Sequence, residues 1–127
     1  ATYRRTSSGY KIAVSEISSW SWNEGKPELV APSDIPVRVR YYMRLPTWVE
    51  ITVDEAHLGT SYAAPFVTGA VALLMQSKKR KNNPEKFASD VKAAIIASAQ
   101  PLQGYPKVAQ GNGLINLPGA AAILEVS

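Results

Sequence analysis

The segment AAPFVTGAVALLMQS, residues 63–77, limits the possible folds more than any other part of the sequence. Apolar residues lie on nearly every side of the helix that it predicts. A helix without a polar face is buried on most sides in a folded protein. Pro65 fits the first turn, where backbone N–H groups have no partner within the helix. We therefore expect a closely packed central helix, kept narrow by five small residues: Ala63, Ala64, Gly69, Ala70 and Ala72.

Short segments rich in β-branched and aromatic residues precede this helix and predict strands. In residues 36–43, PVRVRYYM, the valines alternate with arginines, as in a half-buried strand. Residues 47–54, TWVEITVD, alternate even more regularly, and the two segments could pair around the RLP at residues 44–46. A further short strand is expected at IAV, residues 12–14. In the second segment, one face carries Trp48, Glu50, Thr52 and Asp54, and the other carries Val49, Ile51 and Val53.

Two helices are expected after the apolar segment. Pro84 and Glu85 suit the first turn of an amphipathic helix capped by Asn83, and Pro101 ends it. The face expected to be buried carries Phe87, Val91, Ala94, Ile95 and Ser98. Residues 104–113 predict a loop, and a short last helix follows with Asn116 as its cap and Pro118 in its first turn. Strands followed by helices indicate an α/β protein. The number of strands is small compared with the number of helices, which indicates that the sheet is incomplete.

Composition excludes several classes of protein. The chain has 127 residues, of which 46% are hydrophobic and 19% charged, as in one modest globular domain. No apolar run is long enough for a membrane span, and without cysteine there are no disulfides or thiolate metal sites. The net charge of +4 lies largely in KKRK, residues 78–81, which suits either a nucleic-acid patch or a solvated helix end. No interleaved aromatic residues accompany it, so we expect no nucleic-acid partner. We expect no membrane partner either, because no apolar run could span a membrane.

Ser61 is the candidate nucleophile. A serine hydroxyl needs a base to take its proton, and the attacked carbonyl needs hydrogen-bond donors for its developing negative charge. The start of a helix supplies such donors, because its first N–H groups are unpaired and the helix dipole is positive there. Gly59 permits a tight turn before the serine. Taken singly, these features also describe a capped structural helix.

Three segments in order then resemble one enzyme family. GTSYAAPFVTGAVALL, residues 59–74, resembles the serine-nucleophile signature of the subtilases, the subtilisin-like serine peptidases. SSWSWNEGKPELVAPSDI, residues 18–35, resembles the family's stretch ahead of that serine. QGNGLINLPGAAAIL, residues 110–124, resembles its closing motif. The resemblance extends over residues 12–124, nearly the whole chain.

The resemblance implies a role for each matching residue. Ser61 would be the acyl-enzyme nucleophile and its backbone N–H an oxyanion donor, while Gly59 and Thr60 would shape the turn. Tyr62 stands where the family often has methionine, and it would narrow the leaving-group side of the cleft or donate a hydrogen bond there. The implied fold has three layers and a mostly parallel sheet. Residues 1–127 would be the carboxy-terminal portion of such a catalytic domain, with part of the sheet missing.

The family's aspartate, histidine and oxyanion asparagine have no counterpart in this sequence. In subtilases they precede the serine by a long stretch of chain, and too few residues precede Ser61 here to hold them. His57 is therefore expected to be a loop residue, although a role as substitute base is not excluded. Asp34, Asp54 and Glu55 are expected to be solvated carboxylates in loops or at strand ends rather than members of a triad. A metal site of Asp54, Glu55 and His57 is disfavoured, because neighbouring strand residues point to opposite faces.

The sequence thus predicts a serine endopeptidase that acts on proteins or peptides. By itself this chain would be inactive, and its partner would be the remainder of the subtilase domain. A non-catalytic subtilase-like scaffold or binding module is the alternative. No cofactor is expected in this segment, although calcium occurs elsewhere in the family, and a secreted location is compatible with the resemblance. Ser33 departs from the pattern, because the family's A-P-G is APS here.

Overall fold

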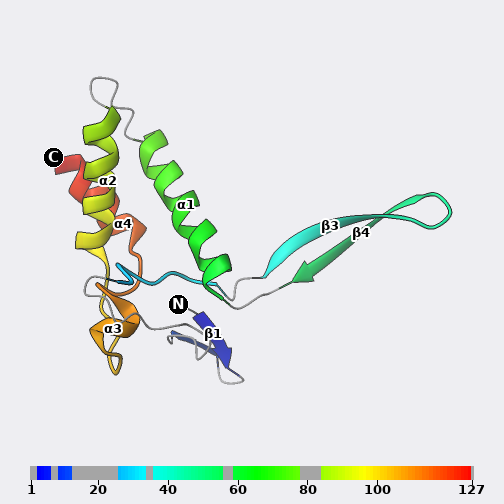
Figure 1. Ribbon diagram of the computed structural model, residues 1–127, viewed down its shortest axis with the longest axis horizontal. Coiled ribbons are helices and arrows are strands. Elements are labelled where there is room, and N and C mark those ends of the chain that lie inside the picture. The colour runs from blue at the N-terminus through cyan, green and yellow to red at the C-terminus, as the bar shows by residue number, and fades with distance from the viewer. Residues whose placement is uncertain are drawn as a thin grey trace.

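The computed structural model describes residues 3–6, 9–12, 26–33, 36–55, 59–77 and 84–126, and it combines helices with strands. Figure 1 shows the helices gathered at one end and one long hairpin extending away from them. This mixture is compatible with the expected α/β class. In chain order the elements are β1 (Tyr3–Thr6), β2 (Gly9–Ile12), β3 (Val37–Arg44), β4 (Trp48–Glu55), α1 (Thr60–Ser77), α2 (Pro84–Ser98), α3 (Lys107–Gln110) and α4 (Leu117–Val126).

The strands form two antiparallel pairs, β1 with β2 and β3 with β4. The β3–β4 hairpin has eight consecutive residue pairs, from Val37 opposite Glu55 to Arg44 opposite Trp48. Its turn is closed by the Leu45 N–H, which donates to the Thr47 carbonyl at 2.9 Å. The predicted pairing around RLP is therefore confirmed, and so are the two predicted faces of β4.

The hairpin has one apolar face and one polar face. Directly opposed residues in an antiparallel pair point to the same side. On this register, the apolar face of the hairpin consists of Val37, Val39, Tyr41, Met43, Val49, Ile51 and Val53. Two ion pairs cross the polar face, Arg38 to Asp54 at 3.0 Å and Arg40 to Glu50 at 3.6 Å. The alternation was predicted correctly, but the expected half-burial of β3 is wrong for the described residues, since Val37 is 51% exposed.

The best-packed part of the molecule lies where α2 and α4 meet. The helix α2 buries the apolar residues of the predicted face, while Ser98 is half-buried. The helix α4 is capped as predicted, with Asn116 Oδ1 accepting the Gly119 N–H at 3.1 Å. Pro118 is in the first turn of α4, and Pro84 is the first residue of α2. The cluster of buried apolar residues consists of Leu74, Phe87, Val91, Ala94, Ile95, Ala120 and Leu124.

Three extended segments meet beside these helices. Leu114 bridges Val30 in parallel and Gln100 antiparallel. The Val30 N–H donates to Gly113 at 2.9 Å, and the Leu114 and Gln100 backbones exchange bonds of 2.7 and 2.8 Å. These contacts bring the segment before the hairpin against the segment before α4. They include a parallel contact, but the described strands form no parallel sheet and no three-layered arrangement.

The structure corrects several details of the apolar helix. The helix begins at Thr60 rather than at Ala63, so Pro65 lies in its second turn. Only Ala63, Ala70 and Leu74 are buried, and Leu73 is 58% exposed, because the described residues cover one side of the helix. The expectation of burial on most sides therefore fails for these residues.

The structure also bears on the loop expected at residues 104–113 and on the strand expected at residues 12–14. The predicted loop at residues 104–113 contains one helical turn, α3, so that prediction was wrong there. Of the predicted IAV strand, β2 includes Ile12, while residues 13 and 14 lie outside the described residues. The same holds for Asn83, the predicted cap of α2, and for the basic run at residues 78–81. Across the described ranges, no helix combines the length and the apolar character needed to cross a membrane.

Candidate active site at the N-terminal end of helix α1

Gly59 forms the turn that starts α1. Its φ angle is +136°, a conformation that side-chain-bearing residues rarely adopt. Its carbonyl accepts hydrogen bonds from the N–H groups of Tyr62 at 3.0 Å and Ala63 at 3.2 Å. Gly59 is therefore the N-cap residue of α1, and its backbone oxygen satisfies the third and fourth amides of the helix.

This arrangement leaves the first two amides of α1, those of Thr60 and Ser61, without a partner inside the helix. Both residues are exposed, and both lie at the positive end of an 18-residue helix. Ser61 thus combines a solvent-accessible hydroxyl with a backbone donor in one residue. The hydrogen bonds of the described residues give Ser61 Oγ no carboxylate or imidazole partner.

Pro65 changes the hydrogen bonding of the helix at the candidate nucleophile. In a regular helix the Ser61 carbonyl would accept the N–H of the residue four positions later, and that residue is Pro65, which has no N–H. One turn on, the Thr68 hydroxyl adds a bond of 3.1 Å to the Ala64 carbonyl. The proline therefore removes the helical bond at the Ser61 carbonyl, while the Ser61 N–H has no helical partner because it lies in the first turn.

Tyr62 lies beside this turn and near the hairpin. Its side chain is 49% exposed, and a Cβ atom added to Gly59 would lie 3.8 Å from Tyr62 Cδ2. On the hairpin, the Tyr41 hydroxyl donates to Glu55 Oε1 at 2.6 Å. That hydrogen bond is the main reason why the pKa of Tyr41 is raised above its usual 10.0, and the nearby Tyr62 raises it further. Tyr62, near the start of α1, therefore lies close enough to Tyr41 to affect its ionisation.

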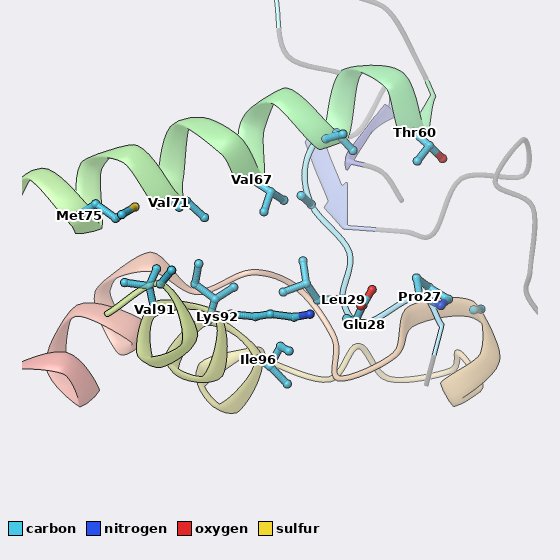
Figure 2. A pocket seen from close by; sticks show the side chains of 16 residues that line it. Pro27, Glu28, Leu29, Thr60, Val67, Val71, Met75, Val91, Lys92 and Ile96 are labelled. Atoms are coloured by element: carbon cyan, nitrogen blue, oxygen red, sulfur yellow. The ribbon is translucent and has the colours of Figure 1, made fainter. Parts of the chain in front are cut away.

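A groove runs along α1 from the candidate site. It has a volume of about 570 Å³, and its walls come from α1, α2, the segment at residues 27–31 and Ala109 of α3. Figure 2 shows Thr60 at one end and Met75 toward the other, with Val67 and Val71 between them and α2 opposite. Because Thr60 is the neighbour of Ser61, the groove and the candidate nucleophile belong to adjoining parts of one surface.

The groove carries charge on only one side. Lys92 extends from α2 along the groove toward Glu28 (Figure 2). Glu28 pairs with Lys26, and this hydrogen bond lowers the pKa of Glu28 below 4.5, with a smaller contribution from Lys92. The remaining walls are formed by alanine and larger aliphatic residues, so the groove is suited to apolar side chains.

The other sequence-predicted candidates do not surround Ser61 in the described structure. Asp54 pairs with Arg38, and Glu55 accepts the Tyr41 hydroxyl, so both are carboxylates at a strand end, as predicted. Asp34 and His57 lie outside the described residues. Among the side chains that the structure does place, no three His, Cys, Asp or Glu residues form a group that could hold a metal ion.

Ser33 is a buried polar residue that the sequence marked only as a departure from the family pattern. It is 5% exposed, and its hydroxyl has no hydrogen-bond partner within the described part of the chain. A buried hydroxyl without a partner costs free energy. In the sequence, the only sign of this feature was APS at residues 31–33, where the family has A-P-G. That Ser33 is buried could be learned only from the structure.

Comparison with known proteins identifies the group to which this chain belongs. The sequence model of the Subtilase family matches residues 3–114, which is most of the chain. The chain is a member of the subtilase family. Subtilases are serine peptidases, so the resemblance noted from three motifs is confirmed at the level of the family.

Curated relatives of this subtilase come from distant organisms. It is 41% identical to tripeptidyl-peptidase 2 of Drosophila melanogaster over 73 residues, which are 56% of this chain and 5% of that protein. It is 43% identical to the membrane-bound transcription factor site-1 protease of Mus musculus over 69 residues, 53% of this chain and 6% of the relative. Pyrolysin of Pyrococcus furiosus is 33% identical over 108 residues, 80% of this chain and 7% of pyrolysin. The chain thus corresponds to a small part of each relative, and no solved structure matches it.

Proposed function

We propose that this subtilase is the nucleophile-bearing, carboxy-terminal portion of a serine endopeptidase domain, with Ser61 as the nucleophile. The observation that carries the proposal is the position of Ser61 at the start of α1, exposed, just after the Gly59 turn. In this reaction Ser61 Oγ attacks the carbonyl carbon of a peptide bond while a base takes its proton. The C–N bond then breaks, the amine leaves with that proton, and water later hydrolyses the ester on Ser61.

The start of α1 would also stabilise the oxyanion. Its negative charge develops on the attacked carbonyl oxygen, and donors placed before the reaction lower the barrier most. The Ser61 N–H is such a donor, because the Gly59 carbonyl is already bonded to the next two amides. Thr60 would support the turn, and Tyr62 would border the side from which the amine leaves.

The base, its carboxylate partner and the second oxyanion donor would come from the rest of the subtilase domain. The absence of any base hydrogen-bonded to Ser61 in the described structure is consistent with this assignment. The groove beside α1 and the exposed apolar side of that helix are also consistent with it, since both offer apolar surface to further elements. The complete domain would have the three layers and the mostly parallel sheet of the family, extending the parallel contact between Val30 and Leu114.

Labelling of the full-length protein with a fluorophosphonate tests the proposal. The probe should modify Ser61, identified by mass spectrometry of the tryptic peptide. Ser61→Ala should abolish the labelling and lower peptide hydrolysis by roughly 10⁴-fold or more. Ser77→Ala is the matched control, because Ser77 lies at the other end of the same helix, where its hydroxyl donates to the Leu74 carbonyl at 3.0 Å. That variant should be labelled at the parental rate.

The 127 residues alone should not be labelled, because they lack the base. A folded full-length protein that also fails to react would contradict the proposal. That result would favour the alternative, a non-catalytic subtilase-like scaffold or binding module.

A further inference from the structure

Most side chains on the apolar face of the hairpin are exposed to solvent. Of the seven side chains on its apolar face, Val39 is partly buried and the other six are exposed. Near the turn, Trp48 is 70% exposed and Leu45 is 67% exposed. Apolar patches of this kind mark binding surfaces in soluble proteins. Tryptophan, tyrosine and arginine dominate the binding energy at protein interfaces. Tyr41 lies on the apolar face, and Trp48 and Arg44 lie on the opposite face near the turn.

The outer edges of the hairpin are also available for pairing. Within the described residues, neither β3 nor β4 pairs with another strand at its outer edge. The register runs through eight consecutive pairs without a bulge, and the prolines Pro36 and Pro46 lie outside the strands. Proteins usually protect such an edge with bulges, prolines or inward-pointing charges. A straight, unprotected edge can instead accept an extended peptide as an additional strand.

The position of β4 connects this surface to the candidate active site. Only residues 56–58 separate the end of β4 from Gly59, and Figure 1 shows β4 running toward the N-terminal end of α1. Eight residues of extended chain measure about 26 Å. A peptide paired along β4 would therefore lie close to Ser61 at one end and far from it at the other.

We propose that the outer edge of β4 and the apolar face of the hairpin bind an extended segment of the polypeptide substrate, several residues away from the bond that Ser61 cleaves. This inference rests on the proposed peptidase function and specifies its substrate class as long, unfolded polypeptide rather than short peptide. The bound segment would place alternate apolar side chains beside Val49, Ile51 and Val53, since side chains on one face of a strand recur every second residue.

Charge indicates one further property of the substrate. Arg38 and Arg40 are paired within the hairpin with Asp54 and Glu50. Arg44, at the turn opposite Trp48, forms no ion pair within the described part of the chain. A substrate carboxylate near the turn would therefore find a cation whose charge is not already balanced.

The experiment compares two lysine substitutions in the full-length protein, with casein as the unfolded protein substrate and a pool of tetrapeptide coumarylamides as the short one. Ile51→Lys places a charge in the middle of the apolar face. Thr52→Lys places the same charge on the polar face, one residue along the same strand. Ile51→Lys should lower kcat/KM for casein about tenfold relative to the tetrapeptides, and Thr52→Lys should leave that ratio within about twofold of the parent.

The rate at which fluorophosphonate labels Ser61 separates this proposal from the proposed function. A parental labelling rate in Ile51→Lys shows that the site is intact, so an unchanged casein-to-tetrapeptide ratio would then overturn the substrate-binding role of the hairpin. A loss shared equally by casein, tetrapeptides and labelling would overturn it too, because it would show a general structural role. If the parent protein is not labelled at all, the peptidase proposal itself has failed.

Hydrogen–deuterium exchange gives an answer that does not depend on catalysis. In the Ser61→Ala variant, casein should slow exchange of the β4 amides that point to the outer edge and are not bonded to β3. If those amides are already protected without casein, the hairpin is covered by the rest of the protein or by a second copy, and the proposal is wrong. Unchanged exchange on addition of saturating casein would also refute it.

Discussion

The α2–α4 pair and the β3–β4 hairpin are held together by different forces. Between the helices, apolar side chains such as Leu124 and Val91 lose nearly all contact with water, each being 2% exposed or less. In the hairpin, strand pairing, two exposed ion pairs and cross-strand contacts provide the order, and almost every side chain remains exposed. Burial of apolar area is the larger stabilising force, whereas exposed ion pairs contribute little. The helical part therefore provides most of the stability, and the hairpin presents exposed surface that can make contacts.

The largest predicted effect tests this difference directly. Leu124→Ala removes buried methyl groups from the α2–α4 cluster, and it should lower the free energy of unfolding by roughly 2–5 kcal/mol. Val53→Ala, on the apolar face of the hairpin, should change it by only about 0.5 kcal/mol. Urea denaturation of the full-length protein, followed by circular dichroism, measures both. Equal losses would show that the hairpin is packed against something as tightly as the helices are.

The second prediction concerns the junction of extended segments beside the helices. Gly113 has a φ angle of +109°, and a Cβ atom there would lie 2.2 Å from the Gln100 carbonyl oxygen. Gly113→Ala should therefore cost about 2–4 kcal/mol, from backbone strain and overpacking together. Gly104→Ala is the control, because its φ is +84° but no atom lies within 4 Å of the added Cβ. That variant should lose only the roughly 1–2 kcal/mol of strain, and a loss equal to that of Gly113→Ala would contradict the close approach.

The smallest effect is a pH dependence within the hairpin. The hydrogen bond to Glu55 raises the pKa of Tyr41 above 10.0, so its contribution is complete below pH 10 and disappears as the pH rises through the raised pKa. In an absorbance titration of tyrosinate, Tyr41→Phe should remove a component that titrates above the usual range. Tyr42→Phe, on the polar face, is the control and should leave that component in place. Loss of the same component in both variants would argue against the Tyr41–Glu55 contact.

Local patterns predicted a large part of the structure correctly. The alternation in residues 47–54 predicted both faces of β4, and the spacing from Phe87 to Ile95 predicted the buried face of α2. Asn116 was predicted as a helix cap and acts as one. These predictions succeeded because strand alternation, helical periodicity and capping depend on neighbouring residues. The boundaries were less accurate, since α1 begins three residues earlier than expected and α3 interrupts a predicted loop.

By itself, the sequence determined the secondary structure of the hairpin and of α2, the turn residue Gly59 and the position of Ser61 at the start of a helix. Its three ordered motifs also pointed to the subtilase family, which the comparison confirmed. The tertiary structure decided which apolar residues are covered, because burial depends on segments that are distant in the chain. It showed that Gly59 caps α1 through its carbonyl, that Pro65 removes a helical bond from Ser61, and that the hairpin extends from the helices with its apolar face exposed. Periodicity shows which side of an element is apolar, but only the packed chain shows whether anything lies against it.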